Sequence, residues 1–436
     1  MNREILRLTV PSIVSNITVP LLGLADVTIM GHIGNERCIA AIAVGSMMFS
    51  VVYWLFGFIR MATSGLTAQA FGASQGQAQG ILTRSLAFSL TIGMMVVLLQ
   101  WPLREAALWL MGPSPEVAEL VVPYYNLCVW GAPAVMGLYS LMGWFIGMQN
   151  TRIPMMIAIG QNVLNIVASL CFVFTLHMNI EGVALGTVVA QWTAFLWAIF
   201  SVNEELRGKS KEKADLSLFT FHSSLFTLHS PLSTLLSPLF PLFLRTLCLV
   251  AVNFYFTSAG ARQGAMMLAV NTLLMQFFTI FSYFMDGFAN AGEALVGRFC
   301  GARDADSLHR VVRQLFLWGG GMVVLFTILY GLGGELFLSL LTSDKTVVEA
   351  ACEYLPWAVL IPLCGMAAFV WDGVFVGLMD TRAMLVSCAV GAVVFFAVWA
   401  MLGTTMGNDG LWLALLVYLA LRGVVLTEFF RRRRFI

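Results

Sequence analysis

Four carboxylates lie inside long apolar stretches, and they are the residues best placed to do chemistry. They are Asp26, Asp286, Glu293 and Asp372, out of 23 Asp and Glu residues. An ionised Asp at the centre of a membrane helix costs about 3 kcal/mol, so it persists where it faces a wet cavity, pairs with a cation or carries a proton. These four residues form the shortlist for an ion or proton site.

Asp26 lies in LLGLADVTIMGHIG, with no basic residue within one helical turn. One interpretation is a carboxylate protonated from outside, which makes Asp26 the candidate ion-coupling residue. The other is an Asp near a helix end, bonded to backbone or to Thr28. Pro11 removes a backbone hydrogen bond from the same predicted helix and permits a bend, either a moving part or a static kink.

The other three acids suggest a charged cluster in the second half of the chain. Asp286 and Glu293 are seven residues apart and therefore share one helix face. Asp372 lies at a comparable depth, and Arg245 is the nearest countercharge. The pattern predicts either an ion or cationic-substrate site or a buried structural ion network, and spacing alone leaves both open.

Polar neutral residues in the first half of the chain are candidates for lining a cavity. Gln161, Asn165, Thr187 and Gln191 occur in two neighbouring apolar stretches, where they line a cavity or bond helix to helix.

The eight cysteines lack CxxC spacing, so no metal site or cofactor is predicted. No HxxE, DDxxD or Ser-His-Asp pattern appears in the apolar stretches, and we expect no enzyme.

Composition indicates the elements that position these residues. The chain of 436 residues is 59% hydrophobic and 11% charged, whereas soluble domains carry about 25% charged residues. Twelve membrane helices need about 240 apolar residues, close to the number present. The sequence therefore predicts an all-α integral membrane protein with 12 transmembrane helices. A net charge of +1 argues against a nucleic-acid partner.

Basic residues predict the orientation in the membrane. With both termini in the cytoplasm, 17 of the 24 Lys and Arg residues fall on the inner side and four on the outer side. We expect a multi-pass membrane protein with both termini cytoplasmic.

The chain also divides into two similar halves. The predicted parts are an N-lobe at residues 1–204, a cytoplasmic linker at 205–234 and a C-lobe at 235–436, with six helices per lobe. GWFIGMQNTR at 143–152 aligns with GVFVGLMDTR at 373–382, an offset of 230, and similar offsets recur at two other places. This indicates a duplicated six-helix unit, and such repeats usually hold a substrate cavity between them.

These features together resemble the MATE multidrug and toxin extrusion transporters, in their DinF-like branch. The resemblance rests on the Asp26 stretch, on GVALGTVVAQ, and on DGFANAGEALVGRFCGA with DGVFVGLMDTR. It implies the pseudo-symmetric two-lobed fold of the MOP superfamily. It also implies a cation-coupled antiporter that exports organic, often cationic and amphipathic, compounds by alternating access.

The family's site residues carry over to matching positions. Asp26 matches the aspartate proposed to take the coupling proton, and Pro11 matches the proline about which that helix is proposed to bend. Asn165 and Thr187 match polar residues of the same cavity. The chain departs from the branch at Ser169, where an aspartate is common.

We expect H⁺ as the coupling ion, with Na⁺ as the alternative, and a monomer. A lipid-linked precursor or metabolite exporter of the same architecture is the alternative function.

Overall fold

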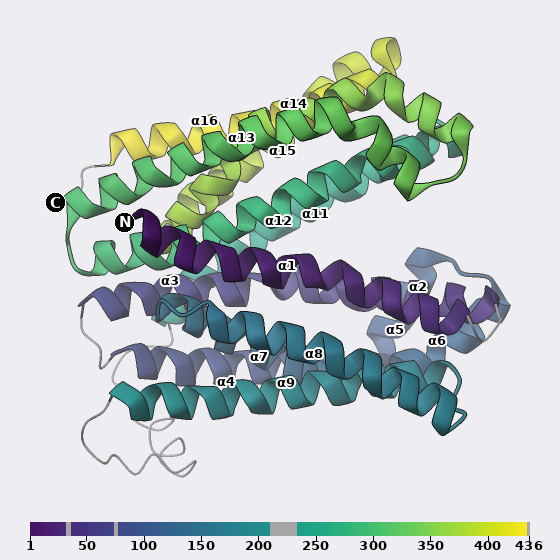
Figure 1. Cartoon of the computed structure of the whole chain (residues 1–436), viewed down its shortest axis with the longest axis horizontal. Coiled ribbons are helices and arrows are strands. Elements are labelled where there is room, and N and C mark those ends of the chain that lie inside the picture. The colour runs from purple at the N-terminus through teal and green to yellow at the C-terminus, as the bar shows by residue number, and fades with distance from the viewer. Residues whose placement is uncertain (32–35, 74–76, 210–232, 434–436) are drawn as a thin grey trace. The chain divides into compact units, whose positions relative to one another are not determined.

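The computed structural model describes residues 1–31, 36–73, 77–209 and 233–433; within these ranges the side chains of 19–28, 30–31, 36, 77, 207–209 and 233–236 are not described. The described chain folds into helices (Figure 1). Eleven described segments are long and apolar enough to cross a membrane, and α1 (Asn2–Gly31) is a further long helix. The prediction of an all-α integral membrane fold is confirmed.

The chain forms two compact units. The N-unit is Val14–Leu235, and the C-unit is Met1–Ile13 with Leu236–Ile436. The helices of the N-unit are α2 (Glu36–Phe56), α3 (Phe58–Ala73), α4 (Gln77–Leu98), α5 (Gln100–Met111), α6 (Pro115–Cys128), α7 (Ala132–Gly147), α8 (Arg152–Leu170) and α9 (Ile180–Lys209). Those of the C-unit are α11 (Ser233–Arg262), α12 (Ala265–Gly301), α13 (Ala305–Leu341), α14 (Lys345–Gly377), α15 (Thr381–Met406) and α16 (Asn408–Arg432).

Both boundaries of the N-lobe proposed from sequence differ from those of the N-unit. Residues 1–13 group with the C-unit because Thr9 and Ile13 of α1 pack against Gly287 of α12. At the other end, α9 continues to Lys209, so residues 205–209 of the proposed linker are helical. Most of that linker, residues 210–232, lies outside the described residues.

Helix α1 contributes to both units. It is one continuous helix (purple in Figure 1), and Glu4 near its start forms an ion pair with Arg298 of α12, at 3.6 Å. Farther along α1, the carbonyl oxygen of Thr18 accepts a hydrogen bond of 3.1 Å from Asn162 Nδ2 of α8, within the N-unit. A single helix is therefore anchored in each unit by its own contacts.

The duplication appears as the same close helix packing in each unit. Two glycines of α7, Gly143 and Gly147, pack on α3, and their counterparts in α14, Gly373 and Gly377, pack on α12. A Cβ at Gly143 would overlap the carbonyl oxygen of Arg60, and one at Gly373 would overlap that of Ala289. Small residues four apart let helix backbones approach closely in a membrane, and both repeats use this device.

The turn after these glycines is also duplicated. Gln149 and Met379 both adopt left-handed backbone, with φ of 65° and 54°. The next residues, Asn150 and Asp380, donate their N–H to the carbonyl oxygens of Phe145 and Phe375, at 2.9 and 3.1 Å. This 6→1 bond is the Schellman arrangement, which ends each helix at the same repeat position.

Asn150 and Asp380 form what we call the turn latches. Each caps the following helix, because its Oδ1 accepts from the backbone N–H three residues on. Each also reaches the end of the last helix in its repeat. Asn150 Nδ2 donates to Glu205 Oε2 of α9 at 3.2 Å, whereas Asp380 Oδ2 accepts from Arg433, just after α16, at 2.8 Å. The latches occupy corresponding positions but have opposite polarity: Asn150 donates to an acid, whereas Asp380 accepts from an arginine.

Opposite polarity allows one latch to be rebuilt in the other's chemistry. In Asn150→Asp alone, the new carboxylate faces Glu205, so we expect the midpoint of thermal unfolding to fall. In Asn150→Asp with Glu205→Arg, the pair reproduces Asp380 with Arg433, so the midpoint should return to near wild type. The expected change in the free energy of unfolding is about 1 kcal/mol, which is typical of a partly exposed charge pair. Equal midpoints for the single and double variants would contradict this assignment.

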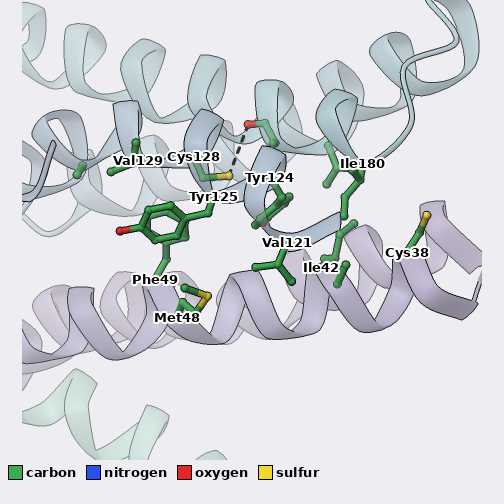
Figure 2. Close-up of a cluster of buried hydrophobic side chains, with 14 of the residues drawn as sticks. Cys38, Ile42, Met48, Phe49, Val121, Tyr124, Tyr125, Cys128, Val129 and Ile180 are labelled. Carbon is green, nitrogen blue, oxygen red and sulfur yellow. Dashed lines mark hydrogen bonds between the residues drawn. The ribbon is translucent and has the colours of Figure 1, made fainter. Parts of the chain in front are cut away.

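Apolar packing in the N-unit joins α2, α6 and α9. Phe49 of α2 stacks on Tyr125 of α6 with ring centroids 4.9 Å apart (Figure 2). Cys128 Sγ donates to the carbonyl oxygen of Ala184 in α9 at 3.9 Å, shown as the dashed line. The buried thiol thus behaves as a small core residue.

Several helices of the N-unit are interrupted where their counterparts in the C-unit continue. Gly57 separates α2 from α3, a 3₁₀ turn (η1, Val129–Gly131) separates α6 from α7, and a π-helical turn (η2, Cys171–Thr175) ends α8. The corresponding α12 and α14 run unbroken for 37 and 33 residues. Helix irregularities of this kind often occur at functional sites.

Candidate functional site

A buried ion cluster lies in the C-unit, formed by Arg245, Asp372 and Arg422. The Oδ2 atom of Asp372, on α14, accepts from Arg245 of α11 at 2.5 Å and from Arg422 of α16 at 2.7 Å. Each arginine is 5% exposed. The cluster therefore ties three helices to one carboxylate oxygen, with charge-assisted hydrogen bonds in apolar surroundings.

The cluster carries one more positive than negative charge. The guanidinium of Arg422 also lies over the ring of Tyr418, 5.4 Å from its centroid. This cation–π contact sets the negative face of a buried ring against part of the excess charge. The other carboxylate oxygen, Asp372 Oδ1, is buried without a hydrogen-bond partner among the described residues. The carboxylate of Asp372 therefore already has two cationic partners in this arrangement.

Asp286 and Glu293 lie on α12, the helix that packs most closely on α14. Glu293 is buried at 2% exposure, whereas Asp286 is partly exposed. Ala289, midway between them, faces Gly373, the residue after Asp372. Asp372 forms ion pairs with Arg245 and Arg422, so the structure joins Arg245 to Asp372 and adds Arg422.

In the N-unit, three of the polar residues form one hydrogen-bonded cluster. Asn165 Nδ2 of α8 donates to Thr187 Oγ1 of α9 at 3.0 Å. Ser169 Oγ, one turn along α8, donates to Asn165 Oδ1 at 3.4 Å. Gly186 lies against Ser169, which brings the two helices close together. Asn165 and Ser169 are buried, so this cluster bonds α8 to α9.

The two glutamines predicted for the same cavity lie in different surroundings. Gln161 of α8 is partly exposed. Gln191 of α9 is 8% exposed, and its Oε1 lies against Gly131 in the 3₁₀ turn without a hydrogen-bond partner among the described residues. A buried amide oxygen without a hydrogen-bond donor costs free energy. The Oε1 atom of Gln191 is such an acceptor.

Asp26 and Pro11 both lie on α1. The side chain of Asp26 is outside the described residues, so its predicted role stays a prediction. Pro11 is buried in the part of α1 that belongs to the C-unit. The helix continues on both sides of it.

Sequence reasoning did not include Arg422 in the cluster. The available signal was an arginine inside an apolar span, which is as costly there as Arg245 is. The sequence does not reveal which face of α16 packs inward, and that orientation decides whether Arg422 faces Asp372 or lipid.

Comparison with known proteins settles the family. The MatE family model matches residues 11–171 and 241–401, two segments of equal length whose offset of 230 is the offset of the internal repeat. The chain belongs to the MatE family. The sequence-based assignment to MATE transporters is thereby confirmed, and the protein is a MATE transporter of the membrane-embedded, multi-pass type.

Individual relatives agree with this family. The chain is 37% identical to the DNA damage-inducible protein F of Escherichia coli strain K12, over 99% of this chain and 92% of that protein. It is 25% identical to the probable multidrug resistance protein NorM of Rhizobium meliloti strain 1021, over 99% and 94% of the two chains. The first relative supports the DinF-like branch.

Solved structures share the fold. One described as an outward-facing conformation of a multidrug resistance MATE family transporter of the MOP superfamily has a TM-score of 0.86 and 19% identity. It covers 98% of this chain and 94% of its own. At this identity the likeness establishes the fold alone.

Proposed function

We propose that this MATE transporter is a proton-coupled antiporter that exports organic, often cationic and amphipathic, compounds across the cytoplasmic membrane by alternating access. The observation that carries the proposal is α1, a continuous helix that bears Asp26 and is anchored in each unit. A change in α1 would act on both units through these anchors.

In this mechanism a proton from outside neutralises Asp26. Removing the charge from an apolar stretch eliminates the need for a wet or paired environment, so α1 can repack. Repacking would alter the contacts of Thr18 with Asn162 in the N-unit and of Ile13 with Gly287 in the C-unit. Pro11 is the proposed point of bending, because its ring removes one backbone hydrogen bond.

Substrate would contact the polar residues of the N-unit. Asn165 and Thr187, with Gln161 and Gln191, offer amide and hydroxyl groups that can bind a varied compound. The unmet acceptor of Gln191 beside the 3₁₀ turn, and the π-helical turn after Ser169, support a role for this region. Their binding role is part of the proposal.

The acids of the C-unit would have different roles. Asp372 has two arginine partners, so binding a cation there would require separating an ion pair in apolar surroundings. We assign Arg245 and Asp372, with Arg422, to holding the C-unit together. Asp286 and Glu293 remain the candidates that attract a cationic substrate or a second ion.

The proposal includes the topology expected from the charge bias. Both termini would lie in the cytoplasm, and a monomer would act with lobes 1–204 and 235–436 joined by the linker 205–234, the first five residues of which continue α9. One proton moving down 100 mV releases about 2.3 kcal/mol, enough for about a fifty-fold gradient of a neutral substrate in one-for-one exchange. Export of a monovalent cation would be driven by the pH difference alone.

Transport into or out of proteoliposomes tests the coupling ion. We expect an imposed pH gradient to drive movement of a fluorescent cationic dye, and a sodium gradient at equal pH on both sides to drive none. Protein-free liposomes provide the control for leakage. Movement driven by sodium and indifferent to pH would reject proton coupling, and movement indifferent to both gradients would reject cation-coupled antiport.

A further inference from the structure

A groove on the C-unit lies between α13, α14 and α16. Its cavity volume is about 400 Å³, and we call it the α13 groove. Its walls are formed by Val312, Arg313, Phe316, Leu317, Trp371 and Thr427.

The floor of the α13 groove is aromatic and has its polar atoms satisfied internally. Trp371 packs edge-on against Phe316, with ring centroids 4.8 Å apart. Its Nε1 donates to Thr427 Oγ1 at 2.8 Å, and Thr427 in turn donates to the carbonyl oxygen of Gly423 at 2.7 Å. The floor of the groove therefore offers hydrocarbon and ring surface to an occupant.

One end of the α13 groove is basic. Arg313 lines the groove, and Arg431 lies one turn beyond Thr427 on α16. The rings of His309 and Phe430 are 5.6 Å apart, so the start of α13 lies beside the end of α16, and both arginines belong to the same end. Both are exposed.

These two arginines differ from their neighbours in their pairing. Arg432 forms an ion pair with Glu428 at 2.6 Å, and Arg433 pairs with Asp380 at 2.8 Å. Among the ion pairs formed by described residues, none involves Arg313 or Arg431. Arg431 also lies within electrostatic range of Glu428, but that carboxylate is paired with Arg432, so positive charge at this end of the groove is available to an anion.

The groove opens along an exposed apolar face of α13. Beyond Arg313 this face continues with the exposed apolar residues Leu317, Val324, Ile328 and Leu332, which are 53–87% exposed. They repeat at helical spacing on a helix that can span the membrane. From Arg313 to Leu332 the helix rises about 28 Å, close to the hydrocarbon thickness of a bilayer. Arg313 thus lies at the depth of lipid headgroups.

We propose that the α13 groove binds an anionic phospholipid from the surrounding leaflet. The lipid phosphate accepts hydrogen bonds from Arg313 and Arg431, and one acyl chain lies along Phe316, Leu317 and Trp371. Charge complementarity selects the anionic headgroup, since a zwitterionic lipid brings its own positive charge beside the two arginines, whereas an anionic lipid brings a net negative charge.

Native mass spectrometry of the full-length protein, delipidated in detergent and titrated with lipid, tests this site. Wild type should retain phosphatidylglycerol in preference to phosphatidylcholine. The double variant Arg313→Gln, Arg431→Gln should retain phosphatidylglycerol about thirtyfold less, because each of the two arginines near a lipid surface contributes about 1 kcal/mol. The matched control is Arg382→Gln, an exposed arginine of the same unit outside the groove, which should behave as wild type.

A second variant tests the acyl-chain part of the groove. Leu317→Trp adds bulk at an exposed position, so folding should persist while the retained phosphatidylglycerol falls. Glycerol phosphate without acyl chains should fail to displace the lipid. Equal retention of phosphatidylglycerol by wild type and the double arginine variant would overturn the proposal. Displacement by glycerol phosphate as effective as by lipid would also overturn it, because the site would then recognise a free phosphate group.

Discussion

Gly373→Ala is expected to destabilise the protein by about 3 kcal/mol, the upper end of the usual cost of overpacking, because the new Cβ would overlap backbone. The Cβ would lie 2.6 Å from the Cα of Ala289 and closer still to its carbonyl oxygen. Backbone atoms of a packed helix cannot rotate away as a side chain can. Accommodating the methyl group would require α12 and α14 to separate along the length of their contact.

The thermal unfolding of purified protein in detergent measures this effect. Gly320→Ala in α13 is the matched control, because nothing lies within 4 Å of its Cβ position, and alanine favours the helix by about 1 kcal/mol over glycine. Gly143→Ala should behave like Gly373→Ala, since it meets the backbone of Arg60 at the same repeat position. Equal unfolding midpoints for the variants at 373 and 320 would show that the backbones are not in close contact.

Asp372→Asn is expected to cost about 3–5 kcal/mol, as when one partner of a buried ion pair is removed. It would leave two buried guanidinium groups without the carboxylate that pairs with both of them. Arg245→Gln should cost less, because one arginine and one carboxylate then remain with balanced charges. This order follows from the excess positive charge of the cluster, and a simple count of lost hydrogen bonds would not predict it.

The same unfolding measurement tests the order of these variants. Glu349→Gln, an exposed carboxylate on the same helix α14, is the matched control and should unfold as wild type does. The assignment of Asp372 to stability would be wrong if Asp372→Asn unfolded at the wild-type temperature while transport was lost.

The sequence predicted the membrane fold and the duplication well, because both leave direct traces in composition and spacing. Apolar runs reveal spans, and the 230-residue offset of the GWFIG and GVFVG segments reveals the repeat. The interruptions at Gly57 and at η1 were not predictable, since the residues on both sides are equally apolar. Their location depends on packing, such as the hydrogen bond of 3.0 Å from Tyr139 to the carbonyl oxygen of Tyr53.

The candidate sites were predictable in part. Burial in an apolar stretch singled out Arg245 and Asp372, and the structure joins them directly. Arg422 was missed because a span's hydropathy does not reveal which way each residue faces. Asn165 and Thr187 were found as polar residues of neighbouring spans, and they bond to each other. Whether they contact substrate is a property of the transport cycle, which no sequence pattern expresses.

The most direct test of the account is pH-driven transport by Asp26→Asn in proteoliposomes. Asparagine matches the neutral carboxylic acid in size and cannot release a proton, so the account predicts that a pH gradient no longer drives dye transport although the protein unfolds at the wild-type temperature. Glu181→Gln, an exposed carboxylate of the N-unit, should transport as wild type does. Wild-type rates of pH-driven transport in Asp26→Asn would contradict the central claim that this carboxylate carries the coupling proton.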